Sequence, residues 1–169
     1  MADGGIYTTE IVPDAANARV FRDALGRFAT GVTVVTIMGP DGPMGFTANS
    51  FASLSLDPAL VLWSPAKASQ RYPFFVAARH YAIHVLGQHQ ADLPARLSRG
   101  GLGFEGLDWK MNAQGVPTLA GALARFDCAQ HATHDGGDHL IIVGQVLRLA
   151  LEEGEPLVFA KGRFGGFAG

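Results

Sequence analysis

Two long apolar segments with a short polar tetrapeptide between them constrain the fold of this chain more than any other feature. They are residues 122–134 (ALARFDCAQHATH) and 139–151 (HLIIVGQVLRLAL), on either side of DGGD. Paired glycines favour the tight turns that join antiparallel strands, because those turns need positive φ angles. The pattern therefore predicts a long β-hairpin.

Alternation along the two segments predicts which side chains face the core. A two-residue turn at Gly136 and Gly137 would place His134 opposite His139. In that register both apolar stripes lie on one face, which contains Ala124, Phe126, Cys128, Ala132, His134, His139, Ile141, Val143, Leu147 and Leu149. We expect this face to point inward, with His139 at its open end.

The rest of the chain predicts further short strands and a few helices. The expected elements are a capped helix over 14–30, paired strands at 31–38 and 44–49, a strand at 59–63 covered on both faces, a helix from about Ser69, a strand at 81–86 and a short helix at 90–99. So many antiparallel strands, with few helices between them, predict a mostly β fold. We expect a closed or split β-barrel rather than a doubly wound sheet.

Length and charge limit the classes of protein to consider. With 169 residues, of which 48% are hydrophobic, the chain can close one core, so we expect a flexible segment at 1–13 and a single domain at 14–169. A net charge of −2 argues against nucleic acid or an anionic membrane surface as partners. Cys128 is the only cysteine, and neither a signal peptide nor a membrane span is evident, which favours a cytoplasmic protein.

The segment GLGFEG, residues 101–106, matches the G-x-G-x-x-G pattern of dinucleotide-binding loops. That pattern works only between a buried strand and a helix, whose N-terminus receives the pyrophosphate. Here the polar PARLSRG precedes it, and Gly115 and Pro117 interrupt the chain that follows. We therefore interpret the segment as a flexible loop that could touch a ligand.

Cys128, His131, His134 and His139 are of the residue types that bind zinc. On a strand Cys128 and His131 point to opposite faces, and Cys128 and His134 are about 20 Å apart at roughly 3.3 Å per residue. We expect no metal. A cross-strand pair with His139 accounts for His134, whereas His139 itself remains a candidate functional residue.

Two polar segments are candidates for ligand binding. The string SPAKASQR places Ser64, Lys67, Ser69 and Arg71 just before an expected helix, where free backbone N–H groups favour a phosphate. The alternative is a capped helix with two solvated cations. The string TANSFASLSLDP, residues 47–58, places several hydroxyl and amide groups among apolar residues. Turn hydrogen bonds or a planar heteroaromatic ligand would satisfy these groups.

The chain resembles the flavin reductase family of FMN-binding split barrels. The resemblance rests on FRDALGRFATGVTVVT, GFTANSFASLSLDPALVLWSPAKASQ, FEGLDW, GVPTLAGALARFDC and GGDHLIIVGQV, in this order. It implies a homodimer of six-stranded Greek-key barrels, with FMN, or FAD, bound near the dimer interface. It also implies NADH or NADPH as hydride donor and a flavin-dependent monooxygenase as the partner that receives reduced flavin.

The same resemblance implies roles for individual residues. It assigns the isoalloxazine ring to Thr47, Ala48, Asn49 and Ser50, the phosphate and ribityl chain to Ser64, Lys67 and Ser69, the nicotinamide to His139, and a closing tail to the segment around Arg163. Many relatives have tyrosine where this chain has Phe164, so a hydroxyl contact is absent there.

The predicted function is an NAD(P)H-dependent flavin reductase. Hydride transfer between the two cofactors needs orientation and exclusion of water more than it needs a nucleophile or a metal. Two alternatives share the barrel: a flavin- or haem-binding redox protein that does not use nicotinamide, and an enzyme like pyridoxamine-phosphate oxidase.

Overall fold

The structure is a computed structural model that describes residues 7, 9–98 and 103–167. Part of segment 1–13 and the start of the Gly101–Gly106 loop therefore lie outside the described residues. The strands are β1 (Thr30–Gly31), β2 (Thr33–Gly39), β3 (Gly42–Ala48), β4 (Ala52–Leu56), β5 (Ala59–Trp63), β6 (His80–Val85), β7 (Trp109–Met111), β8 (Pro117–Leu119), β9 (Ala124–Gly136), β10 (His139–Leu151), β11 (Leu157–Ala160) and β12 (Arg163–Gly166). The α-helices are α1 (Ala18–Leu25), α2 (Tyr72–Ala77) and α3 (Leu93–Ser98).

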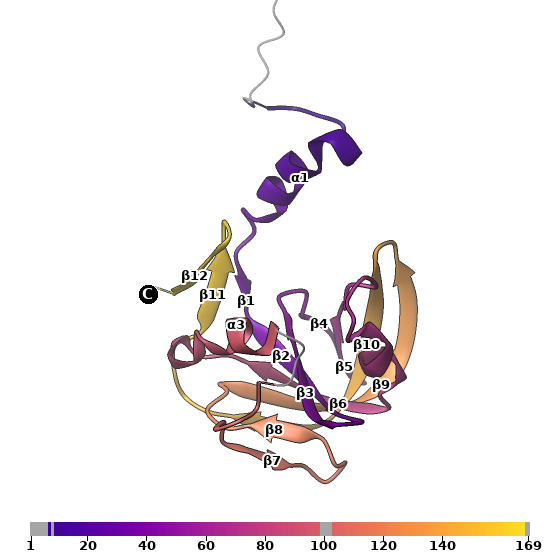
Figure 1. The fold of residues 1–169 in the computed structure, drawn as a ribbon, viewed down its shortest axis with the longest axis vertical. Helices are drawn as coiled ribbons and strands as arrows, with labels where there is room; N and C mark the ends of the chain where they lie inside the picture. Colours follow the sequence, from indigo (N-terminus) through magenta and orange to yellow (C-terminus); the bar gives the residue numbers. More distant parts are fainter. Residues whose placement is uncertain (1–6, 8, 99–102, 168–169) are drawn as a thin grey trace, which may run out of the picture.

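The main sheet is antiparallel throughout and runs in the order β3-β2-β6-β9-β10-β5-β4 (Figure 1). Its two edge strands, β3 and β4, are not hydrogen-bonded to each other, although only residues 49–51 separate them along the chain. The sheet therefore curls without closing, and we call this gap between β3 and β4 the seam. The prediction of a mostly β split barrel is confirmed, with seven strands in this sheet rather than six among the described residues.

Aromatic side chains fill the interior of the curled sheet. Phe46, Trp63 and Phe75 pack edge to face, with ring centroids 5.3–5.8 Å apart, and Trp63 and Phe75 are fully buried. Such rings supply large buried areas together with specific geometry. Cys128 lies in the same core and is 1% exposed.

A second cluster attaches the peripheral elements to the sheet. Leu93 and Leu97 of α3, Leu119 of β8 and Leu157 of β11 pack together with Val34 of the sheet. The β1–β11–β12 sheet is thereby held beside the barrel, and Figure 1 shows it rising on one side while the β9–β10 hairpin rises on the other.

A buried histidine links three strands beneath this cluster. The Nδ1 atom of His84 lies 3.1 Å from the Val34 carbonyl oxygen, and its Nε2 atom accepts a hydrogen bond from the Leu119 backbone N–H at 3.0 Å. This pattern requires a neutral imidazole with its proton on Nδ1. Burial lowers the pKa of His84 to about 4, with the Val34 contact opposing the shift.

The predicted hairpin is confirmed, but its predicted register is wrong. His139 pairs with Gly136, and His134 pairs with Ile141, so the turn residues are Gly137 and Asp138. Gly137 has a φ of +74°. A glycine at the first central position suits a type II′ turn, which matches the twist of the strands.

The inward stripe predicted on the second strand is also wrong in part. The side chains of β10 that pack on the core are Leu140, Ile142 and Val146, which alternate on the face opposite to the predicted one. Leu147 and Leu149, expected to point inward, are about half exposed, although Val143 is buried. Register shifts interrupt the pairing between Val143 and Gly144 and between Val146 and Arg148. Gly144 is required at the first shift, because a Cβ there would collide with the Tyr81 hydroxyl.

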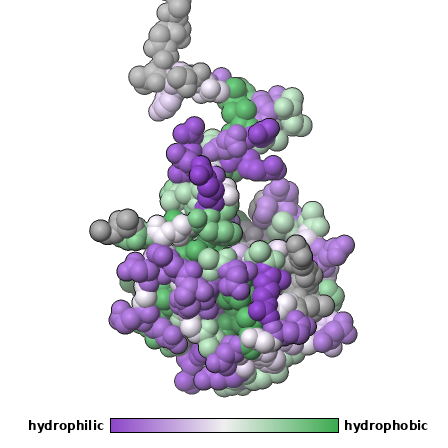
Figure 2. Space-filling view, turned by 60° about the vertical axis from the view of Figure 1, so that its left-hand side comes forward, coloured by the Kyte–Doolittle hydropathy of each residue, from purple (hydrophilic) through white to green (hydrophobic). Residues whose placement is uncertain are grey.

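The N-terminal helix and the strand at 59–63 both differ from the prediction. The cap at Asp14 is confirmed, since its carboxylate accepts hydrogen bonds from the Ala16 and Asn17 N–H groups, but it caps a 3-10 turn at Ala15–Asn17 that precedes α1. α1 itself ends at Leu25 and buries no residue. Strand β5 is fully covered on one face only, because Val61 and Trp63 are buried while Leu60 and Leu62, on the opposite face, are partly exposed. Figure 2 shows apolar side chains on the surface of the upper part of the molecule, where α1 stands away from the sheet.

No helix within the described ranges is long and apolar enough to cross a membrane.

Candidate functional site

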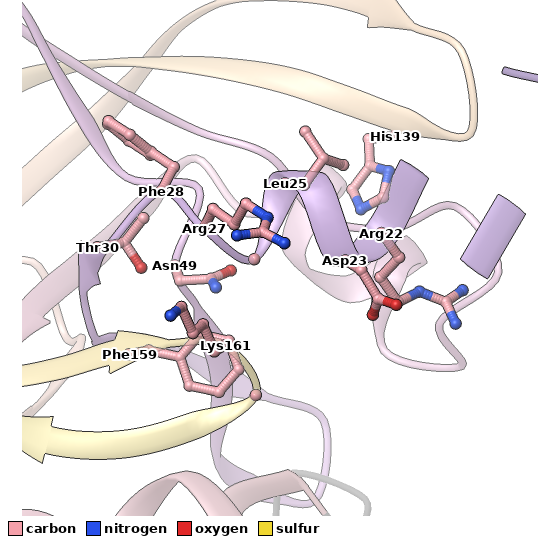
Figure 3. A pocket seen from close by; sticks show the side chains of 12 residues that line it. Arg22, Asp23, Leu25, Arg27, Phe28, Thr30, Asn49, His139, Phe159 and Lys161 are labelled. Carbon is pink, nitrogen blue, oxygen red and sulfur yellow. The ribbon is translucent and has the colours of Figure 1, made fainter. Parts of the chain in front are cut away.

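A cavity of about 860 Å³ lies above the seam, between α1, the tip of the β9–β10 hairpin and the β11–β12 turn (Figure 3). Its volume is within the range of small-molecule sites, about 300–1,000 Å³. The lining residues are Arg22, Asp23, Leu25, Gly26, Arg27, Phe28, Thr30, Asn49, His139, Phe159, Lys161 and Gly162. Asn49 and His139, both predicted site residues, are therefore brought together here.

His139 reaches the cavity because it begins β10 directly after the tight turn. Its Nδ1 atom lies 2.7 Å from the Asp138 carboxylate, and this hydrogen bond lowers the pKa of Asp138. A carboxylate at Nδ1 favours the tautomer with its proton on that atom and fixes the ring. Nε2 is then available to a ligand.

The segment that precedes α2 lies alongside the same hairpin tip. Ala66 bridges to His139, the Lys67 N–H donates to the Asp138 carbonyl at 2.9 Å, and the Leu140 N–H donates to the Pro65 carbonyl at 3.1 Å. The predicted phosphate segment and the predicted nicotinamide histidine are therefore neighbours, although the sequence separates them widely.

Ser50 and Ser64 hold two of the predicted segments together. The Ser64 N–H donates to the Ser50 hydroxyl at 2.9 Å, and that hydroxyl donates to the Ser64 carbonyl at 3.2 Å. Ser50 thus fixes the residues 49–51 that span the seam against the end of β5.

The two cations predicted near the phosphate have protein partners. Lys67 forms an exposed ion pair with Asp135 of the hairpin, and this hydrogen bond raises the pKa of Lys67 and lowers that of Asp135. Arg71 donates to the carbonyls of Gly45 and Leu97 at 2.6 and 2.9 Å and lies over the Phe46 ring. Arg71 therefore links α2 to β3 and α3.

Ser69 lies apart from the main cavity. It lines a second, smaller cavity of about 330 Å³ together with Asp41, Arg71, Phe74 and Ser98. Its hydroxyl accepts a hydrogen bond from the Arg71 N–H at 3.3 Å.

Three other predicted site residues do not line the main cavity. Thr47 donates its hydroxyl to the Pro94 carbonyl at 3.3 Å, and Ala48 is buried at the end of β3. Arg163 is exposed on β12, one residue beyond Gly162 of the cavity wall, and the side chain of Phe164 packs on Phe159. These residues frame the cavity rather than form its surface.

Sequence reasoning missed the basic wall of the cavity, Arg22, Arg27 and Lys161. Arg22 and Arg27 belong to the FRDALGRF string, which carried the resemblance, and Lys161 to the KGRF segment around Arg163, which the resemblance implied as a closing tail. The signal was a pair of charged strings at opposite ends of the chain, and only the fold shows that they meet.

The remaining motifs contribute no second centre. Residues 103–106 form a turn in which Phe104 is buried and the Gly103 carbonyl accepts from Arg96 Nε at 2.7 Å, so no helix follows the glycines. Among the described residues, no group of three His, Cys, Asp or Glu side chains is placed to hold a metal ion.

Fold and cavity together define a split-barrel protein with a site of nucleotide size over its open seam. A family model described as "Flavin reductase like domain" matches residues 25–168. FMN reductase (NADH) SmoA of Agrobacterium fabrum is 59% identical over 93% of this chain and 90% of its own length. The chain belongs to the flavin reductase family.

Solved structures agree with this assignment. Nitrilotriacetate monooxygenase component B from Mycobacterium thermoresistibile is 38% identical, covers 92% of this chain and 89% of its own, and superposes with a TM-score of 0.86. An NADH:FAD oxidoreductase of Streptomyces globisporus, solved with NAD and FAD fragments, is 36% identical over 94% of this chain and 98% of its own, also with a TM-score of 0.86.

Proposed function

We propose that this chain is an NADH-dependent flavin reductase that supplies reduced flavin to a flavin-dependent monooxygenase. The observation that carries the proposal is the cavity that joins Asn49 at the seam to His139 at the hairpin tip. Family membership supports the chemistry, and relatives named as FMN reductase and as reductase subunits of monooxygenases support the donor and the partner. FMN is the expected acceptor, with FAD as an alternative.

The residues around the seam fit a flavin. The Asn49 side chain faces the cavity with both a donor and an acceptor, which suits the polar edge of the isoalloxazine ring. Thr47, Ala48 and Ser50 hold the loop through strand and hydroxyl contacts, and Ser64, Lys67 and Ser69 are assigned to the phosphate and ribityl chain. Arg163 is assigned to the hairpin that closes over the ring.

Reduced nicotinamide gives its hydride to flavin, and the protein has to bring the two rings together. His139, fixed by Asp138, would position the nicotinamide. The apolar side chains of Leu25, Phe28 and Phe159 line the cavity in which the two rings would meet.

We also propose that the protein is a homodimer. Leu54 and Leu56 of β4 and Leu147, Leu149 and Leu151 of β10 are 47–98% exposed, and both strands are neighbours of β5. Several exposed leucines on adjoining strands form the kind of patch that marks a protein interface. We also propose a cytoplasmic location, because a chain with a single cysteine cannot form the internal disulfides that are typical of oxidising compartments.

Anaerobic mixing of the FMN-loaded protein with NADH tests the proposed function. We expect the flavin absorbance near 450 nm to bleach on the order of ~0.1 s, the turnover time of a median enzyme. An unchanged spectrum, with reduction by another protein or by dithionite still possible, would show that the chain is a flavin carrier that does not use nicotinamide.

A further inference from the structure

The cavity carries more positive charge than the proposed flavin contacts use. Arg22, Arg27 and Lys161 line it against one carboxylate, Asp23, and none of the three cations has an ion-pair partner within the described part of the chain. Cations gathered in a concave site concentrate the field and attract anions. The segment 64–69, assigned to the flavin phosphate, does not contribute to this wall.

Lys161 occupies a backbone position that disfavours lysine. β11 and β12 pair up to Ala160 and Arg163, so Lys161 and Gly162 form a two-residue turn in which both have positive φ, +50° and +76°. This is the type I′ pattern, for which Asn-Gly is the preferred sequence. A lysine retained in such a conformation at the edge of a cavity indicates a role for its side chain.

A backbone hydrogen bond brings two of the cations to the same wall. The Lys161 N–H donates to the Gly26 carbonyl at 2.7 Å, and Arg27 follows directly after Gly26. The β11–β12 turn is thereby fixed at the end of α1, and Figure 3 shows the side chains of Arg27, Asn49 and Lys161 around the cavity. The two charges are held together by the fold although they lie at opposite ends of the sequence.

We propose that Arg27 and Lys161, with Arg22, bind the diphosphate of the nicotinamide dinucleotide. This inference rests on the proposed function, because it takes NADH as the donor. A nicotinamide beside His139 leaves the remainder of the molecule in the same cavity, which the three cations line. Guanidinium and ammonium groups form charge-assisted hydrogen bonds to phosphate oxygens, and arginine does so in bidentate geometry.

The test compares Lys161→Asn and Arg27→Gln with Arg19→Ala, which removes an exposed cation of α1 outside the cavity. Lys161→Asn creates the preferred turn sequence, so its melting temperature should be equal or higher. With FMN as acceptor, each of the two variants should raise the KM for NADH about tenfold and leave kcat nearly unchanged. Reduced nicotinamide mononucleotide, which lacks the adenylate half, should show a much smaller change, and Arg19→Ala should show none.

Direct binding separates this inference from the proposed function. Calorimetry with ADP-ribose should show binding to the wild type that weakens about tenfold in Lys161→Asn and Arg27→Gln, whether or not the protein turns over NADH. If NADH is oxidised normally and neither variant changes its KM, the inference is wrong and the proposed function stands. If the variants weaken FAD but not NADH, the cations bind the FAD diphosphate and the inference is likewise overturned.

Discussion

The imidazole of His139 is held in place by the residues next to it in the chain and by a neighbouring segment. Gly137 makes the tight turn, Asp138 bonds to the ring, and Ala66 pairs with the backbone of His139. A side chain supported in this way is pre-organised to orient a ligand, which is what a reaction between two cofactors requires from the protein.

Replacing His139 by alanine should therefore impair the donor and spare the acceptor. We expect a higher KM for NADH and slower flavin reduction, with the FMN dissociation constant within about a factor of three, less than ~0.7 kcal/mol. Stopped-flow reduction and FMN titration measure the two effects. His134→Ala, an exposed histidine of the same hairpin outside the cavity, is the control; a collapse of FMN affinity in His139→Ala would make His139 a flavin residue.

His84 predicts how stability depends on pH. Its pKa is about 4 in the folded protein and about 6.5 when unfolded, so the stability it contributes is complete above pH 6.5 and is lost as the pH falls toward 4. Between pH 7 and pH 5 this loss should amount to about 2 kcal/mol. Urea unfolding at both pH values measures this loss of unfolding free energy. His84→Gln should be less stable at pH 7, but its stability should change little between pH 7 and pH 5. An equal slope in both proteins would assign the pH dependence to other groups.

Single residues of the site were predictable to different degrees. Asn49 and His139 belong to strings whose order and spacing carry the family resemblance, and both line the cavity. Arg27 also lies in such a string and Lys161 in the segment implied as a closing tail, but their meeting depends on the hydrogen bond between Lys161 and Gly26, which no local pattern encodes. Their φ angles and partners are properties of the folded chain.

Among the elements, the β9–β10 hairpin was predictable from the sequence, but the orientation of its side chains was not. Its existence follows from apolar alternation and glycine turns, but alternation assumes two residues per repeat. Alternation alone does not say which of the two faces is inward, and Leu140, Ile142 and Val146 take the core side, so Leu147 and Leu149 point outward. Gly144 was the local sign of the first register shift.

The segment between β5 and α2 gives a prediction about phosphate binding. Lys67→Ala combined with Ser69→Ala should weaken FMN far more than riboflavin, because only FMN carries the charged phosphate. Fluorescence titration with both flavins measures the difference. Equal weakening for both ligands would remove the phosphate from this segment.

Asp135 offers the reciprocal test of the same segment. It pairs with Lys67 at the surface, where ion pairs contribute little to stability. Asp135→Asn should therefore leave folding intact, free the lysine, and tighten FMN by roughly two- to fivefold. If FMN binding weakens instead, the ion pair itself holds the segment in place.

At the scale of the whole molecule, the seam and the exposed leucines both leave surface that no element of this chain covers. A barrel that fails to close leaves strand edges and apolar faces uncovered, and proteins cover such surfaces with another element or another subunit. Leu56, which is 98% exposed, belongs to the surface that the proposed homodimer would cover.

Leu56→Glu combined with Leu149→Glu should dissociate the proposed dimer. Burying two carboxylates in a formerly apolar contact should weaken association roughly a hundredfold or more. Sedimentation should then report a species near the chain mass of 17.8 kDa. Met111→Glu, a half-exposed residue of β7, controls for added charge; a wild type that sediments as a monomer would refute the homodimer.

The reaction rate of the Cys128 thiol reports how often the whole barrel opens. The only thiol of the chain is 1% exposed, and burial raises its pKa to about 12, so it is neither reachable nor ionised while the sheet is intact. A chromogenic disulfide reagent will react with this thiol only in molecules whose core has unfolded. The rate of colour development therefore reads out unfolding in water without denaturant, and flavin should slow that rate in proportion to how much more tightly it binds the folded state.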